Sequence, residues 1–155
     1  MLQHAWNDDL NAFTQSYGCD NLDASILVMP TVGFLPATDP RFQQTLQACS
    51  EHLRAGKAPL LYRYLNDDGI EGPEGAFLLP SFWMVEANAL GGDLRAARAD
   101  LTRLISYMSP LGLYAEEIHP DTNELLGNFP QGFSHLGLLN AIFRLEALKR
   151  AKDGW

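Results

Sequence analysis

The chain has 155 residues, of which 46% are hydrophobic and 19% charged, and its formal net charge at pH 7 is −8. This composition is typical of a globular domain and excludes a chain whose main state is disordered. A domain of this length can bury roughly 70% of its unfolded surface, so we expect residues 1–155 to form a single domain. The 11 lysine and arginine residues form no basic run that could follow phosphates, so nucleic acid is not an expected partner.

The cysteines and the amino-terminal residues indicate the compartment. Cys19 and Cys49 lack the spacing of a zinc site or a disulfide framework, and we expect both to be reduced. The opening residues "MLQHAWNDDL" contain neither the basic nor the apolar region of a signal peptide, so the sequence predicts a cytoplasmic location. The longest apolar run, residues 77–90, is interrupted by polar side chains and is too short to span a bilayer.

The spacing of apolar residues predicts six helices, of which three lie in the first part of the chain. Residues 2–18 carry apolar side chains at helical spacing and polar side chains between them, which predicts an amphipathic helix. Residues 22–29 are almost all apolar and predict a short helix that is buried on all sides. The third helix begins with Asp39 as N-cap and Pro40 in the first turn, and continues to Leu53 with one apolar stripe.

The second part of the chain repeats this alternation. A possible short strand at residues 60–64 precedes a helix over residues 76–90 that is apolar nearly all round. Residues 93–108 predict an amphipathic helix, and residues 133–149 a helix that is apolar around most of its circumference. Alternating amphipathic and buried helices favour two layers of outer and inner helices joined as antiparallel hairpins. A helical-repeat scaffold is the rival architecture, although the sequence shows no internal repeat.

Paired carboxylates occupy the long loop "GLYAEEIHPDTNELLGNFPQGFSH", residues 112–135. Solvated charges beside a turn are one interpretation of these glutamates. The aromatic residues Tyr114, Phe129 and Phe133 suggest another, since flat apolar faces beside hydrogen-bonding acids suit a sugar ring. Inverting glycoside hydrolysis needs an ionised carboxylate to take a proton from water, and a carboxylic acid roughly 6.5–9.5 Å away to protonate the leaving oxygen.

Three long stretches resemble a known family: "YGCDNLDASILVMPTVGFLPATDPRF", "YRYLNDDGIEGPEGAFLLPSFWMVEA" and "GLYAEEIHPDTNELLGNFPQGFSHLGLLNA". In collinear order they resemble the C-terminal half of bacterial glycoside hydrolase family 15 proteins, the glucoamylase, glucodextranase and trehalase group. The resemblance covers nearly the whole chain and is specific for the family but not for the substrate. It implies an all-α fold, because the family's catalytic domain is an (α/α)6 toroid of outer and inner helices. The six predicted helices would form half of that ring.

The resemblance also implies a reaction. Family members are inverting exo-glycosidases that need no metal or other cofactor, so the implied partner is an α-glucan or α-glucoside such as a maltooligosaccharide, dextran or trehalose. Glu116 resembles the general base of relatives, and Glu117 resembles the neighbouring residue that contacts the substrate. Arg63 falls where relatives place an arginine on the sugar at the cleavage site, and a guanidinium can hold two hydroxyl groups at once. From residue types alone, a surface ion pair of Arg63 with Asp67 or Asp68 is the alternative.

One part of the family's site has no counterpart in the sequence. The family's general acid lies in the N-terminal half of the ring, in a "GxWE"-like motif, and Glu74 in "GPEGAF" corresponds to no acid of relatives. We therefore expect a truncated or split chain with exposed apolar sides, paired with a second copy or with a separate N-terminal half. Hydrolysis by this chain alone is expected to be weak or absent. The alternative function is a non-catalytic helical module that binds carbohydrate or another protein.

Overall fold

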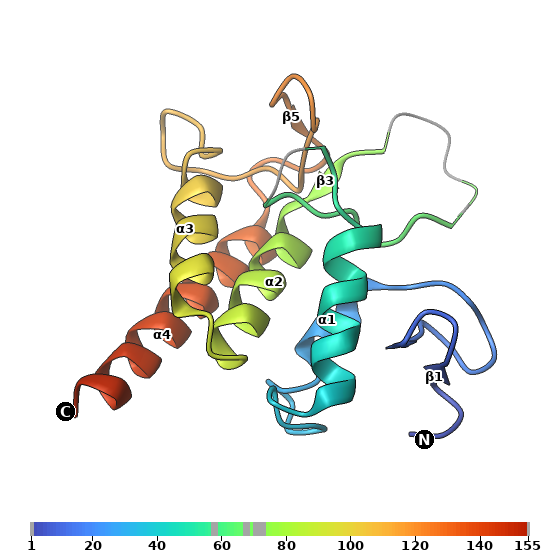
Figure 1. Ribbon diagram of the computed structural model, residues 1–155. Coiled ribbons are helices and arrows are strands. Elements are labelled where there is room, and N and C mark those ends of the chain that lie inside the picture. The colour runs from blue at the N-terminus through green and yellow to red at the C-terminus, as the bar shows by residue number, and fades with distance from the viewer. Residues whose placement is uncertain (1, 57–58, 67–68, 70–73, 155) are drawn as a thin grey trace.

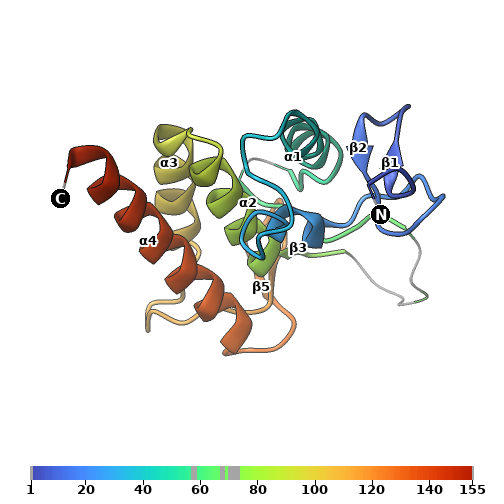
Figure 2. The same ribbon diagram turned by 90° about the horizontal axis from the view of Figure 1, so that it is seen from below.

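Four α-helices lie side by side in the computed structural model, which describes residues 2–56, 59–66, 69 and 74–154 (Figure 1). They are α1 (Pro40–His52), α2 (Leu78–Leu90), α3 (Leu94–Ile105) and α4 (Gly132–Asp153). The central helix α2 contacts α3 and α4 on one side and α1 and the short 3-10 helix η1 (Ala24–Val28) on the other. Figure 2 shows the two termini at opposite ends of this row.

The helix starts that were predicted from capping residues are confirmed. The Asp39 side chain accepts a hydrogen bond of 2.9 Å from the backbone N–H of Arg41, and Pro40 occupies the first turn of α1. The Asp93 side chain accepts a bond of 2.9 Å from the N–H of Ala96 at the start of α3. Each cap satisfies a backbone donor that the first helical turn leaves without a partner.

Helix α2 is buried nearly all round, as its apolar sequence predicts. Phe82 has no exposed surface and Val85 only 1%. Glu86 is also buried, and burial raises the pKa of its carboxyl above the usual range, whereas nearby Arg144 of α4 acts in the opposite direction. The Arg144 Nε lies 3.8 Å from Oε2 of Glu86, so this ion pair joins the central helix to α4.

The predicted helix over residues 2–18 is wrong. This segment forms a hairpin of two short antiparallel strands, β1 (Trp6–Asn7) and β2 (Ala12–Phe13). The Asn7 side chain accepts hydrogen bonds of 2.9 Å from the backbone N–H groups of both Asp9 and Leu10, and Asn11 has a φ of 48°. Local bonds of this kind compete with helical ones, which explains why "NDDLN" turns despite helical apolar spacing.

Other elements also differ from the prediction. Residues 22–29 contain the 3-10 helix η1, and the possible strand at residues 60–64 reduces to a single bridge between Arg54 and Leu61. The part of the chain that the structure describes therefore contains four α-helices and one 3-10 helix in place of the six helices expected. The fold is mainly helical, with a few short strands.

A small antiparallel sheet that the sequence did not predict covers one end of the helix row. It consists of β3 (Ala76–Phe77), β4 (Glu117–Ile118) and β5 (Leu125–Leu126), with β4 in the middle. Figure 1 shows this sheet above the amino end of α2. Within the residues that the structure describes, no helix has both the length and the apolar character needed to cross a bilayer.

Candidate active site

The backbone of Glu116 is fixed on both sides. Its N–H donates a hydrogen bond of 2.9 Å to the carbonyl of Asn128, and its own carbonyl accepts one of 3.1 Å from the N–H of Leu78. Glu116 therefore lies between the returning arm of the β4–β5 hairpin and the first residue of α2. The sheet and the central helix together determine where its side chain begins.

The carboxylate of Glu116 is held through one oxygen. Its Oε2 accepts hydrogen bonds from the backbone N–H of Asn128 at 3.1 Å and from the Asn128 side-chain amide at 2.8 Å. No described residue donates a hydrogen bond to Oε1, and the residue is only half-buried. One oxygen is thus oriented by the protein, while the other is open to an outside donor such as water.

Two glycines leave room for the paired carboxylates. A Cβ atom at Gly127, where φ is +71°, would lie 2.9 Å from Cβ and 3.0 Å from Oε2 of Glu116. A Cβ atom at Gly75 would lie 2.8 Å from the Cβ of Glu117 and would also overlap its Oε2. Real side chains do not approach so closely, so both carboxylates occupy space that only glycine leaves free.

Glu117 lies in the middle strand, paired with Phe77 on one side and Leu126 on the other. Burial raises the pKa of its carboxyl, and the negative charges of Glu74 and Glu116 raise it further. The exposed carboxylate of Glu74 is therefore close enough to affect the charge state of Glu117, although the family resemblance gave Glu74 no role. Among the described residues, none donates a hydrogen bond to the Glu117 carboxylate.

The amino ends of two helices flank the glutamate pair. Helix α2 begins at Leu78, which donates to the carbonyl of Glu116. Two hydrogen bonds anchor the start of α4 to the residues just before Glu116. The hydroxyl of Ser134 donates to the carbonyl of Ala115 at 2.8 Å, and the backbone N–H of Gln131 donates to the carbonyl of Tyr114 at 2.9 Å. Helix amino ends carry a partial positive charge, which stabilises negative groups placed beside them.

Arg63 lies on the next segment along the same edge. Its carbonyl accepts a hydrogen bond of 2.8 Å from Ala24, and two residues earlier the carbonyl of Leu61 accepts one of 2.8 Å from Phe77 of β3. The segments around residues 61–63, 76–78 and 116–118 are thus consecutive neighbours. No contact joins the Arg63 side chain to either glutamate in the part of the chain that the structure describes.

The ion pair of Arg63 is made with a residue that the sequence did not suggest. Its Nε lies 3.5 Å from Oδ2 of Asp23, a side chain that is only 5% exposed, while the Arg63 side chain is 47% exposed. The guanidinium also lies over the ring of Tyr64, 5.6 Å from the ring centre. Asp67 and Asp68, the alternative partners, lie outside the described residues. Arg63 is tethered to a buried carboxylate but remains accessible.

The aromatic residues of the loop divide into two groups. Tyr114 is fully buried, its hydroxyl donates to the carbonyl of Leu104 at 2.9 Å, and its ring packs against Phe82. It belongs to the core, so the prediction that it offers a face to a sugar is wrong. Phe129, in the loop before α4, and Phe133, in the first turn of α4, are 49% and 61% exposed.

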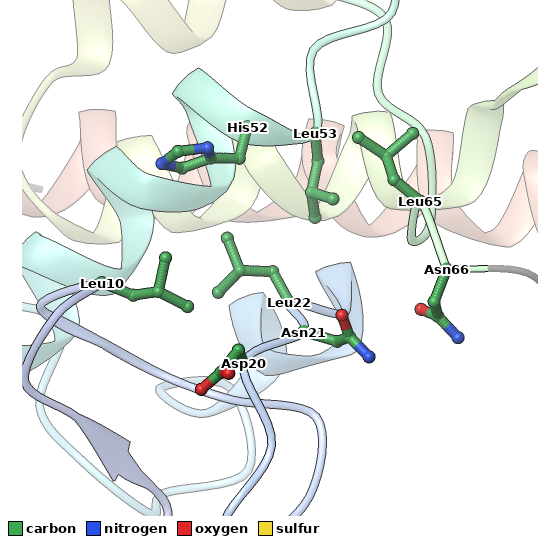
Figure 3. A pocket seen from close by; sticks show the side chains of 8 residues that line it. All are labelled: Leu10, Asp20, Asn21, Leu22, His52, Leu53, Leu65 and Asn66. Carbon is green, nitrogen blue, oxygen red and sulfur yellow. The ribbon is translucent and has the colours of Figure 1, made fainter.

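The described carboxylates form no group with histidine or cysteine that could hold a metal ion. A pocket of about 170 Å³ lies elsewhere, between the tip of the first hairpin, the end of α1 and residues 65–66 (Figure 3). Neither glutamate of the pair lines it. Both glutamates of the pair are half-buried.

Solved structures share the fold of this chain. A protein described as "Glycosidase Wild Type" superposes with a TM-score of 0.79 at 18% identity, over 94% of this chain and 41% of the other. The four helices and the small sheet are therefore arranged as in a segment of a glycosidase. At this level of identity the likeness concerns the fold alone.

Sequence comparison gives the family. The family model of "Glycosyl hydrolases family 15" matches residues 1–101 and 93–143, and the chain belongs to this family. A trehalase of Thermoplasma acidophilum is 44% identical over 149 residues, covering 91% of this chain and 26% of the relative. A trehalase of Mycolicibacterium smegmatis is 47% identical over 147 residues, covering 94% and 22%. The chain thus spans about a quarter of the length of these curated relatives.

Proposed function

We propose that this chain supplies the general base and two sugar contacts of an inverting glycoside hydrolase that cleaves an α-glucosidic bond. The observation that carries the proposal is the one-sided fixation of the Glu116 carboxylate. Asn128 orients it through Oε2, and Oε1 accepts nothing from the described residues. A general base needs this arrangement, because it must be positioned by the protein and still be free to take a proton from water.

In the proposed reaction, a water molecule donates a proton to Oε1 of Glu116 and attacks the anomeric carbon. The bond to the leaving oxygen breaks on the opposite face of the sugar, and a separate carboxylic acid protonates that oxygen. Glu117 and Arg63 hold hydroxyl groups of the sugar at the cleavage site. We assign the general acid to no residue of this chain.

The proposed substrate is trehalose, among the α-glucosides that the family resemblance allows. Relatives that are 44% and 47% identical to this chain are trehalases. The exposed ring of Phe129 beside the glutamates suits the flat face of a glucose ring. Maltooligosaccharides and dextran are the comparison substrates.

We also propose that another protein segment covers the free face of α4, contributed by a second copy or by a separate N-terminal half of the domain. Four large apolar side chains along this helix are between 45% and 69% exposed. They are Phe133, Leu136, Leu139 and Phe143. A patch of this kind on one helix usually marks an interface. The partner would bring the general acid to the base, and hydrolysis by this chain alone is therefore expected to be weak or absent.

The test is a graft of this chain into the Mycolicibacterium smegmatis trehalase, in place of the segment of that protein to which it is similar. We expect the graft to hydrolyse trehalose, and Glu116→Gln to lower kcat by about 10²–10⁴-fold, because the amide keeps the shape but cannot accept the proton. Glu124→Gln is the matched control, since Glu124 is an exposed glutamate of the same hairpin. A folded graft whose Glu116→Gln variant keeps its activity would contradict the role of Glu116. A folded graft that binds trehalose without cleaving it would favour the non-catalytic module.

A further inference from the structure

A cleft of about 370 Å³ separates the first turns of α3 from the last turns of α4. Its lining combines apolar and cationic side chains: Leu94, Arg95, Arg98, Leu145, Lys149 and Lys152. In both views the amino end of α3 and the carboxyl end of α4 lie away from the strands that carry the glutamate pair (Figures 1 and 2). Lys149 is 17 residues beyond Gly132, so it lies roughly 25 Å along α4 from the end beside Glu116. The cleft is a separate site.

The cations of this cleft form no ion pair with the part of the chain that the structure describes. Each of the four side chains is exposed, and none forms an ion pair or a side-chain hydrogen bond with another described residue. The nearest capping carboxylate, Asp93, is engaged with the backbone N–H of Ala96. Four of the 11 lysine and arginine residues thus face one cleft in a chain whose net charge is −8.

Lys152 lies in the last turn of α4, where the helix dipole favours a cation, but the spacing of the cations is unfavourable. Arg95 and Arg98 are three residues apart, as are Lys149 and Lys152, and like charges at this spacing on a helix repel each other. Arg95 also lies in the first turn of α3, where the helix dipole disfavours a positive charge. A bound anion would relieve the repulsion within each pair, because it neutralises the cations.

We infer that this cleft binds a polyphosphate group, either free or carried by a nucleotide. Two pairs of cations on facing helices suit a ligand with several linked anionic groups better than one with a single charge. The volume is within the range of about 300–1,000 Å³ that small-molecule sites occupy, which leaves room for an organic portion beside Leu94 and Leu145. The inference does not depend on the glycosidase proposal.

The experiment is isothermal titration of the 155-residue chain at about 0.15 M ionic strength, where the Debye length is about 8 Å, with ATP, tripolyphosphate and inorganic phosphate, all without divalent cations. We expect saturable binding of ATP or tripolyphosphate that is tighter than that of phosphate. The double variant Arg98→Gln with Lys149→Gln should weaken it by about tenfold or more, since each change removes a charge-assisted contact. Tighter binding of ATP than of tripolyphosphate would assign a nucleotide, and equal binding would assign the polyphosphate group alone.

The matched control removes two cations from the same helices outside the cleft. Arg103 of α3 and Arg150 of α4 are exposed and do not line it. The variant Arg103→Gln with Arg150→Gln should change the dissociation constant by less than about twofold, because exposed charges at a distance are largely screened. Equal weakening in both double variants, or no saturable binding by the folded chain, would overturn the inference. Circular dichroism of all variants establishes that they are folded.

Discussion

Glu116 illustrates how a loop residue becomes a positioned group. The sequence shows two adjacent glutamates, and the resemblance to the family suggests which is the base and which contacts the sugar. The structure adds Asn128, which binds Oε2 through both its backbone and its side chain, and Gly127, which leaves space for the carboxylate. Both follow Leu126 in the returning arm of the hairpin, so their relation to Glu116 depends on strand pairing.

Replacement of Gly127 by alanine tests this positioning. At a φ of +71° an alanine costs about 1–2 kcal/mol of stability, and its Cβ would displace the Glu116 side chain. In the trehalase graft we expect kcat to fall by about ten- to a hundredfold, because small displacements of a catalytic group are costly. Gly112→Ala is the control, since Gly112 has a φ of +73° and open space around it. It should lower the melting temperature similarly and leave kcat unchanged. An equal loss of kcat in both variants would argue against the packing role.

At the residue scale, the structure limits what residue type alone can predict. Tyr114, Phe129 and Phe133 share a loop and a chemical class, yet the first is buried in the core and the other two are exposed. The hydroxyl of Tyr114 donates to the carbonyl of Leu104, which lies in helix α3. The ion pair of Arg63 with Asp23 also joins segments 40 residues apart, and no local pattern predicts it.

At the element scale, capping residues predicted the helices more reliably than the spacing of apolar residues did. The Asp39 and Asp93 caps set the starts of α1 and α3 correctly, because a cap is a local bond between a side chain and the next turn. Apolar spacing alone suggested a helix over residues 2–18, where the side chain of Asn7 forms a turn instead. The three-stranded sheet was missed because its strands have two residues each and come from distant segments.

Helix α4 leads to a prediction about association. Its free face exposes Leu139 by 45% and Phe143 by 69%, so we expect the 155-residue chain to self-associate in light scattering. The variant Leu139→Gln with Phe143→Gln should shift it toward a monomer. The control is Val32→Gln with Leu111→Gln, whose side chains are 70% and 81% exposed on other parts of the surface. A monodisperse monomer of the unsubstituted chain would contradict a second copy as the partner on this face.

At the scale of the whole molecule, the expectation of a fragment of a glycosidase fold is borne out by its relatives. The chain covers 41% of a glycosidase structure and about a quarter of each trehalase, with one row of helices around α2. The family resemblance supplied this expectation, since alternating buried and amphipathic helices are common to many helical folds. The number of helices was predicted less accurately, because the amino-terminal segment is a hairpin and not a helix.

The central claim is that Glu116 acts as the base of an inverting reaction, and azide rescue of Glu116→Ala in the trehalase graft tests it most directly. Azide attacks without giving up a proton, so it needs no base and can occupy the space that the shortened side chain leaves. We predict that Glu116→Ala loses trehalose hydrolysis, that azide restores turnover, and that the product is β-glucosyl azide, inverted relative to the α-linkage. Full activity of the variant without azide, or release of only α-glucose from trehalose by the unsubstituted graft, would contradict the account.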